Sequence, residues 1–275
     1  MEAVWTRFFP LTLSIQDFIA AGKLGTVKRV YADLSFWNDV EGEFGTEHRM
    51  VNAELAGGAL LDLGVYSLTW AFLVLYHLQA EGERKKPVVK GAMSKYAATG
   101  CDEMTSIILD FPEAGVGTRY AAGEGNGDGD VMPRDNGDAH ALALTCLRVS
   151  NAPNKDHPVS DPVRIQGTLG DITVAPPSYR TLSYTLVPAA NESRGKLADW
   201  EYETKTFEIP GGHGMFWEAD ECARCIRDGK LESSVMGWEE SVALMEVMDE
   251  VRKQGGLVYP EAIESLEYPL EGFGI

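Results

Sequence analysis

Basic residues are scarce in this chain. Twenty-four lysines and arginines stand against forty-two aspartates and glutamates, which gives the 275 residues a formal net charge of −18. That charge repels nucleic acid and anionic membrane surfaces and leaves no strongly basic patch for either. We therefore expect neither nucleic acid nor a membrane among the partners.

Cysteine is scarce as well, and no secretory signal is visible. Four scattered cysteines are too few for the disulfide framework of a secreted domain. The segment Met1 to Pro10 has no basic region, long apolar region or small-residue cleavage site. Both features predict a cytoplasmic protein.

Several familiar site motifs are also missing. The five histidines never pair at metal-ligand spacing, and Cys222-x-x-Cys225 lies within a helical pattern without a second ligand pair, so we predict no metal site. No serine nucleophile elbow occurs. The glycines of 123–129 are followed by aspartates and Pro133 rather than by a helix, which predicts an exposed loop and not a dinucleotide loop.

What the sequence does contain is a run of strand patterns between helices. After an apolar, β-prone segment at Val4 to Phe9 and a helix ending at Gly22 or Gly25, alternation predicts a strand over 27–37 and a long helix over 54–78. Strand-like segments then follow without room for crossover helices, at 88–97, 105–111, 117–123, 141–150, 163–175 and 181–187. Two helices, 215–229 and 238–254, come last. The pattern predicts an α+β fold with a large, mostly antiparallel sheet and helices on one face.

Asp62 and Tyr66 interrupt the apolar run that begins at Gly57. A carboxylate inside the segment 56–78 favours a buried helix over a membrane span. On a helix, side chains four residues apart lie on one face, so the acid and the phenol are a candidate site. The alternative is structural: a buried tyrosine bonded to a nearby carbonyl and an aspartate that caps or bridges locally.

Five segments together resemble a known family. They are Met1-EAVWTRFFP, Gly57-GALLDLGVY, Val163-RIQGTLGDI, Gly214-MFWEADECARCIRDGKLES and Glu250-VRKQGG. In these segments the chain is similar to the substrate half of dimeric dihydrodiol dehydrogenases and NADP-dependent D-xylose dehydrogenases, within the glucose-fructose oxidoreductase and inositol dehydrogenase superfamily.

The resemblance implies a two-part organisation. Family members have an N-terminal Rossmann domain that binds NADP, then a sheet domain that carries the substrate pocket and often the dimer interface. By this comparison, residues 1–25 correspond to the last strand and helix of an otherwise missing Rossmann domain. Residues 26–275 correspond to the α/β substrate-binding and dimerisation domain, which predicts a homodimer through the sheet face.

The resemblance also implies residue roles. Tyr66 matches the family's general acid or base, and Asp62 matches an aspartate that helps to hold substrate. Trp5 matches an aromatic wall of the pocket, and Arg7 of the same motif is a candidate cofactor contact.

An ungapped count along the next strand gives two further substrate positions. It places the family's basic and aromatic pocket residues at Lys28 and Leu34. Leu34 departs from the aromatic pattern, but Phe36 shares its strand face and can substitute for it.

Two family elements have no counterpart in these 275 residues, namely a phosphate-binding G-x-G-x-x-G and the lysine of Glu-Lys-Pro. We therefore expect the chain alone neither to bind NADP nor to transfer hydride. The expected function is NADP-dependent oxidation of a sugar, D-xylose to xylonolactone, or of a trans-dihydrodiol, carried out by a longer form. The alternative is a non-catalytic sugar-binding or dimerisation domain that pairs with a full-length paralogue.

Overall fold

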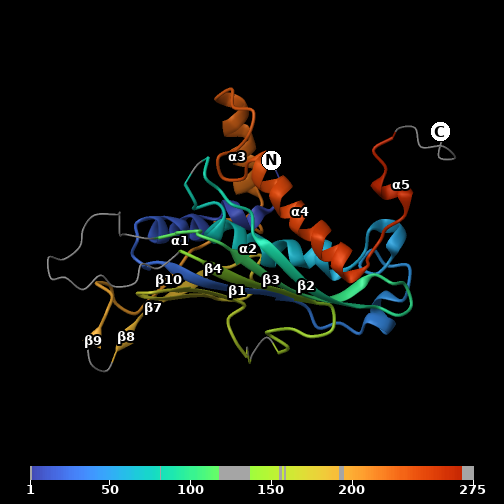
Figure 1. Cartoon of the computed structure of the whole chain (residues 1–275), viewed down its shortest axis with the longest axis horizontal. Helices are drawn as coiled ribbons and strands as arrows, with labels where there is room; N and C mark the ends of the chain where they lie inside the picture. The colour runs from blue at the N-terminus through green and yellow to red at the C-terminus, as the bar shows by residue number, and fades with distance from the viewer. Residues whose placement is uncertain are drawn as a thin grey trace.

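The sheet dominates the architecture (Figure 1). The computed structural model describes residues 2–80, 82–117, 137–154, 157, 159–191 and 195–267. Eight strands form one sheet in the order β10-β7-β6-β5-β1-β4-β3-β2, and β8 and β9 pair separately. The strands are β1 Val27–Ser35, β2 Val88–Lys95, β3 Asp102–Phe111, β4 Ala139–Cys146, β5 Val163–Gly167, β6 Gly170–Val174, β7 Ser183–Pro188, β8 Ala190–Asn191, β9 Gly195–Lys196 and β10 Glu203–Thr206.

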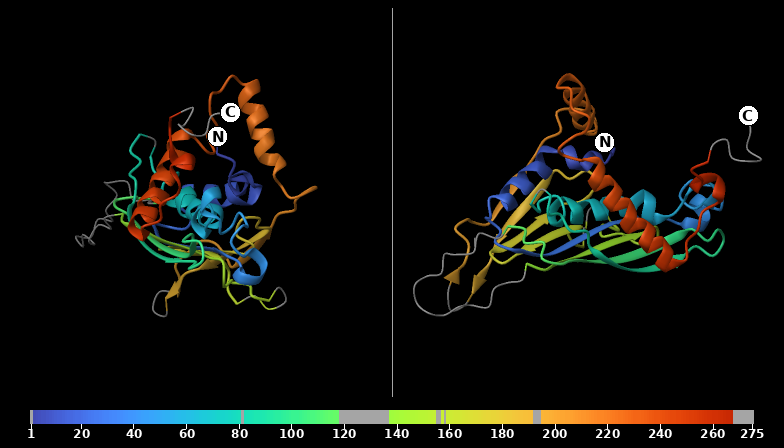
Figure 2. Two further views of the ribbon diagram at one scale, coloured as in Figure 1. Left: turned by 90° about the vertical axis from the view of Figure 1, so that its right-hand side faces the viewer. Right: turned by 45° about the horizontal axis from the view of Figure 1, so that its top comes forward.

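The main helices cover one face of this sheet, and α3 projects away from it (Figures 1 and 2). The α-helices are α1 Pro10–Ala20, α2 Val65–Leu75, α3 Phe216–Arg227, α4 Trp238–Gly255 and α5 Glu261–Glu264. Four short turns precede or separate them: 3-10 helices η1 Trp5–Phe8 and η3 Ala53–Leu55, and π-helical turns η2 Val40–Phe44 and η4 Leu60–Gly64. Only β1 and β4 pair in parallel; the other neighbours in the eight-stranded sheet are antiparallel. The predicted α+β class, with a mostly antiparallel sheet and helices on one face, is confirmed.

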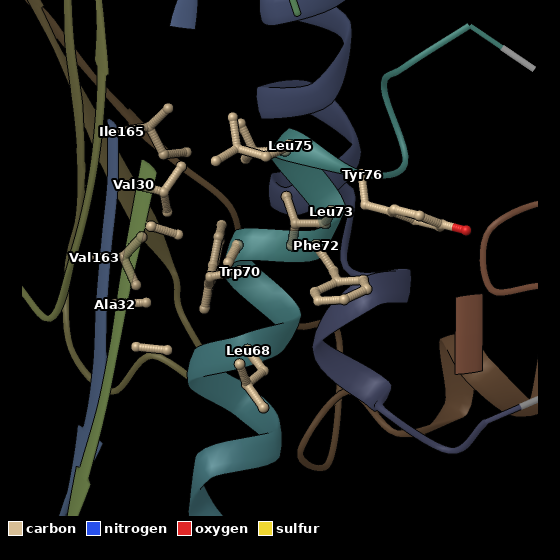
Figure 3. Close-up of a cluster of buried hydrophobic side chains, with 14 of the residues drawn as sticks. Val30, Ala32, Leu68, Trp70, Phe72, Leu73, Leu75, Tyr76, Val163 and Ile165 are labelled. Carbon is tan, nitrogen blue, oxygen red and sulfur yellow. The ribbon is translucent and has the colours of Figure 1, made fainter. Parts of the chain in front are cut away.

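The core lies between the sheet and α2 (Figure 3). Trp70 extends from α2 toward Val30 and Ala32 of β1 and Val163 of β5. Its indole nitrogen donates to the Ser178 carbonyl at 2.9 Å, so the buried polar edge of the ring has a partner. The helical stretch Ala53–Leu75 is long and apolar enough to cross a membrane, but 78% of its apolar window is buried inside the protein. It is the central helix of the core.

The start of this helical stretch differs from the prediction. The sequence predicts a helix from residue 54, but Ala56 has φ 53° and Gly58 has φ 135°, which interrupt it. Helical winding resumes at Leu60, whose amide donates to Asp102 Oδ2 at 2.8 Å. A distant strand residue therefore caps the turn, and a Cβ on Gly58 would lie 2.1 Å from Asp102 Oδ1. No local pattern signals either constraint.

The predicted strand at Val4 to Phe9 is wrong, because these residues form the 3-10 turn η1. All four residues of η1 are buried. A 3-10 helix has three residues per turn, so successive side chains point in different directions. In η1 each of these side chains packs against another part of the protein. The following helix, α1, ends before Gly22 as predicted, at φ 66°.

The first twenty-five residues dock on the rest of the protein. Leu11 and Ile15 of α1 are fully buried in the same core cluster as Trp70. The division of the chain at residue 25 stays a prediction.

Two loop and strand predictions have mixed outcomes. The segment 163–175 is a hairpin of β5 and β6 rather than one strand, because the chain reverses between Gly167 and Gly170. Apart from Gly117, the predicted strand at 117–123 lies outside the described residues, as does most of the glycine-rich loop 123–138. The ends of the two last long helices are confirmed, with Gly229 at φ 66° and Gly256 at φ 62°.

Candidate functional site

Tyr66 is the centre of the candidate site. It is the second residue of α2, it is half-buried, and its hydroxyl oxygen accepts a hydrogen bond from Trp5 Nε1 at 2.9 Å. Within the described residues, no group accepts the phenolic proton of Tyr66. The hydroxyl is therefore held by one donor while its own proton is available to a ligand.

The turn η1 holds this arrangement through three successive residues. Trp5 bonds to Tyr66, and the hydroxyl of Thr6 donates to the Tyr179 carbonyl at 2.6 Å. Arg7 forms an ion pair with Glu240 of α4. The turn thus connects α2, the loop after β6 and α4, which explains why it is buried.

Aromatic rings surround the phenol. The Tyr179 ring lies 6.1 Å from Tyr66, 5.9 Å from Trp5 and 6.1 Å from Phe36, between ring centroids. Phe9 packs edge-on against Trp5 at 5.6 Å. These rings come from four separate segments of the chain and form an aromatic wall beside the hydroxyl.

Asp62 lies near Tyr66 but has its own partner. Its carboxylate accepts a hydrogen bond from Arg49 Nη1 at 2.5 Å, and both side chains are partly exposed. Asp62 belongs to the π-helical turn η4, whose wider winding changes the i, i+4 alignment expected for a regular α-helix. The charge of Asp62 still acts on the phenol, since it contributes to the pKa of Tyr66.

Burial raises the pKa of the Tyr66 phenol above its ordinary value of 10.0. The hydrogen bond from Trp5 lowers this pKa, and the negative charges of Asp62 and Glu218 raise it. None of the described groups that act on this phenol is a cation. At neutral pH Tyr66 is therefore protonated and is a proton donor.

Arg7 is buried away from solvent. Its guanidinium is 1% exposed, pairs with Glu240 and donates to the Val235 carbonyl at 2.6 Å. The second oxygen of Glu240 lies 2.8 Å from His77 Nδ1. These contacts are all internal, so they give Arg7 a structural role; the predicted cofactor contact stays a prediction.

The substrate positions counted along β1 separate in space. Leu34 is buried, packs in one cluster with Tyr66 and donates its amide to Ser67 Oγ at 2.8 Å. Lys28 lies six residues away, about 20 Å along an extended strand, and donates to the Asp138 carbonyl at 2.9 Å. The structure thus brings Trp5, Leu34 and Tyr66 together and leaves Lys28 at the other end of the strand.

Two residues of the site have no signal in the sequence. Tyr179 lies in a loop after a Pro-Pro pair, and Glu218 lies in the first turn of α3. One oxygen of the Glu218 carboxylate is buried without a hydrogen-bond partner in the described part of the chain. Tyr179 packs against the Tyr66 ring, and the charge of Glu218 contributes to the pKa of Tyr66.

We tested whether these residues suit a dinucleotide. A pyrophosphate site needs a parallel strand, a glycine-rich turn and the N-terminus of a helix. In the part of the chain that the structure describes, the eight-stranded sheet has a single parallel pair of strands. Within this part it has no parallel strand that leads through a glycine-rich turn into a helix. The described residues do not fit NADP. The same part of the chain has no group of three or more histidine, cysteine or acidic side chains placed to hold a metal ion.

A mostly antiparallel sheet with helices on one face, and a phenol beside an aromatic wall, differs from the parallel sheet of a nucleotide-binding fold. The family model for the GFO/IDH/MocA C-terminal domain matches residues 12–127. Over these residues the chain is similar to this family.

Particular relatives share most of the chain. D-xylose 1-dehydrogenase (NADP(+)) of Hypocrea jecorina is 46% identical over 98% of this chain and 62% of its own length. Trans-1,2-dihydrobenzene-1,2-diol dehydrogenase of Danio rerio is 31% identical over 95% of this chain and 63% of its own length. The chain thus spans less than two thirds of these relatives.

Solved structures confirm the fold. Aldose-aldose oxidoreductase from Caulobacter crescentus, complexed with glycerol, has a TM-score of 0.61 at 17% identity and covers 92% of this chain and 60% of its own. Levoglucosan dehydrogenase, in complex with NADH and levoglucosan, has a TM-score of 0.60 at 13% identity and covers 92% of this chain and 62% of its own.

Proposed function

We propose that this chain is the substrate-binding domain of an NADP-dependent dehydrogenase that oxidises a sugar such as D-xylose or a trans-dihydrodiol. The observation that carries the proposal is the Tyr66 hydroxyl, which is fixed by Trp5 at 2.9 Å and keeps its proton for a ligand. The 46% identity to a D-xylose dehydrogenase supports the sugar.

In this proposal Tyr66 moves the proton while another group takes the hydride. Oxidation of an alcohol requires the phenolate form of Tyr66 to accept the hydroxyl proton, and reduction of a carbonyl requires the neutral phenol to donate one. Because burial raises the pKa of Tyr66, a cation beside it is needed for the oxidative direction. The described residues supply no pyrophosphate cradle, so we derive no step through NADP and propose that the chain alone does not turn over.

Trp5 and Asp62 have distinct proposed roles. The indole N–H stabilises the phenolate form of Tyr66, because it donates to the oxygen that becomes charged. In this proposal the side of the site that faces the substrate is lined by Asp62, by Leu34 of β1 and by Phe36, which follows β1. Lys28 and Arg7 remain proposals that the geometry does not support.

A chimaera tests the dehydrogenase. The chain is joined to the part of the Hypocrea jecorina relative that it does not match, and NADPH formation with D-xylose is followed at 340 nm. We expect activity that falls by about 10² or more in Tyr66→Phe. Tyr202→Phe, which removes the same hydroxyl from a tyrosine that is 67% exposed, is the matched control. A chimaera that folds, binds NADPH and oxidises neither D-xylose nor a trans-dihydrodiol contradicts the proposal.

Direct binding tests the stand-alone state. We expect NADPH to produce no calorimetric heat with the 275-residue chain at micromolar concentration. Clear micromolar binding would show that these residues form a nucleotide site after all.

We also propose that the uncovered face of the sheet forms a homodimer, or pairs with a full-length paralogue in the non-catalytic alternative. Met104 and Ile108 of β3 are 44% and 49% exposed there, and the paired residues of β4 include Leu142 opposite Ile108. Sedimentation should give a dimer that Ile108→Lys dissociates. A monomer at micromolar concentration contradicts this part of the proposal.

A further inference from the structure

Glu240 is a carboxylate buried in the first turn of α4. Its side chain is only 2% exposed, and carboxylates are seldom buried to this extent unless their oxygens are bonded. Here each oxygen has a partner of its own: Oε1 pairs with Nη1 of Arg7, and Oε2 accepts a hydrogen bond from Nδ1 of His77 at 2.8 Å. One side chain therefore joins two separate segments.

These two segments are the ones that carry the candidate site. Arg7 lies in η1, two residues after Trp5. His77 comes directly after the C-cap of α2, and Tyr66 is the second residue of that helix, about 16 Å away along its axis. Glu240 connects η1 with the end of α2, while the hydrogen bond of 2.9 Å between Trp5 and Tyr66 connects η1 with its start.

The bond between Trp5 and Tyr66 depends on where η1 lies. An N–H···O bond weakens once nitrogen and oxygen are more than about 3.2 Å apart, so a small displacement of the turn is enough to lose it. The four residues of η1 form one short turn, in which the amide of Arg7 donates to the Val4 carbonyl at 3.0 Å. A shift of Arg7 is therefore transmitted to Trp5.

Stability alone does not explain this cluster, because apolar residues of similar volume often replace a buried ion pair without loss of stability. Both oxygens of Glu240 are satisfied, and satisfied buried polar groups favour one defined arrangement of the segments that they join. Arg7 adds a third segment, since its Nη2 donates to the Val235 carbonyl before α4 at 2.6 Å.

We propose that Glu240 is a positioning residue: it holds η1 through Arg7 and the end of α2 through His77, and so keeps the indole N–H of Trp5 on the hydroxyl oxygen of Tyr66. The consequence for catalysis rests on the proposed function, because that function assigns the proton transfer to Tyr66. The geometric consequence does not, and it is measured without substrate or nucleotide.

The test is an NMR measurement on the 275-residue chain. Its six tryptophans give six indole N–H signals, and Trp5→Phe identifies the signal of Trp5. Tyr66→Phe gives the position and the hydrogen-exchange rate of this signal when the bond is absent. The variant Arg7→Met with Glu240→Leu removes the ion pair at similar volume. We expect its Trp5 signal to lie close to the position in Tyr66→Phe and to exchange about tenfold faster than in the wild type.

Glu240→Gln is the conservative variant. Its amide oxygen still accepts from Arg7, and its NH2 group donates to the other tautomer of the His77 ring, so the Trp5 signal should keep its wild-type position although the protein is less stable. The double variant should show the opposite combination, namely recovered stability and a displaced signal. Equal displacement in the two variants would overturn the inference, because a signal that follows the loss of charge does not report on position.

Two other tryptophans serve as internal controls. The indole of Trp70 donates to the Ser178 carbonyl at 2.9 Å, and that of Trp200 donates to the Lys23 carbonyl at 2.8 Å. Both signals should keep their wild-type positions in every variant.

His77→Phe is a second variant, which leaves Arg7 paired and breaks only the connection to the end of α2. It should displace the Trp5 signal in the same direction. An unchanged Trp5 signal in the folded double variant overturns the inference, and so does one in His77→Phe if the double variant does not fold. Displacement of the Trp70 and Trp200 signals together with that of Trp5 also overturns it, because the whole protein is then loosened.

This inference and the proposed function fail in different ways. In the chimaera, the double variant should lower kcat for D-xylose about tenfold and leave KM within about twofold, because orientation rather than binding is lost. If the Trp5 signal moves as expected but the wild-type chimaera oxidises neither substrate, the positioning by Glu240 stands and the proposed function is wrong. If the wild-type chimaera is active and the double variant keeps both its kcat and the Trp5 signal, only the inference is wrong.

Discussion

Glu240→Gln should destabilise the protein by about 3 kcal/mol, because it leaves the guanidinium of Arg7 buried without a counter-ion. Arg7 is 1% exposed and Glu240 2%, so water cannot replace the lost partner. Removing one member of a buried ion pair costs about 3 to 5 kcal/mol, and the amide of glutamine retains part of the hydrogen bonding, which places the estimate at the lower end.

Urea unfolding followed by far-UV circular dichroism measures this change. Glu246→Gln is the matched control: Glu246 lies on the same helix and pairs with Lys86, but both of these side chains are about half exposed. The control should cost less than about 1 kcal/mol. The slope of the unfolding free energy against urea concentration should be the same in all variants if the substitutions change only stability.

A double variant separates the ion pair from the packing around it. Arg7→Met with Glu240→Leu removes both charges and should recover much of the loss, because apolar residues of similar volume often replace a buried pair at little cost. The same experiment reports on the site, since Arg7 holds the turn that presents Trp5 to Tyr66. A loss for Glu240→Gln no larger than that of Glu246→Gln would refute the reasoning.

Two further predictions concern pH and backbone geometry. Burial by itself raises the pKa of Glu240, but the bonds of its carboxylate to His77 and Arg7 outweigh burial and hold this pKa below 4.5. The stability that the carboxylate contributes is therefore complete above pH 4.5 and is lost as the pH falls through the lowered pKa. Urea midpoints between about pH 7 and pH 3 should fall less steeply in Glu240→Gln than in the wild type, and parallel curves would contradict this. Gly58→Ala should cost at least about 2 kcal/mol, because φ is 135° and the new Cβ would lie 2.1 Å from Asp102 Oδ1. Gly82→Ala, at φ 79° with no atom within 4 Å, is the control that carries backbone strain alone, and an equal loss in both variants would show that Asp102 does not matter.

The candidate site was only partly accessible from the sequence. The apolar run around Tyr66 and the resemblance of Trp-Thr-Arg-Phe-Phe-Pro identified Trp5 and Tyr66, which the structure joins by a hydrogen bond across 61 residues. Tyr179, whose ring packs against Tyr66, and Glu218, whose charge acts on the phenol, were missed because both lie in segments more than 100 residues away in the chain. Lys28 stays a prediction from an ungapped count along β1, which gives a position on the strand but not a distance from Tyr66.

The sequence by itself determined the α+β class, the burial of the central helix and the ends of α1, α3 and α4. These features depend on local rules: the period of apolar residues and the left-handed conformation that Gly22, Gly229 and Gly256 adopt. The tertiary structure decided that residues 4–9 form a turn, that the central helix begins only after Gly58, and that Arg7 is buried against Glu240. Each of these depends on a partner that lies far away in the chain, and the preference of a short segment is weaker than the free energy of satisfying buried polar groups.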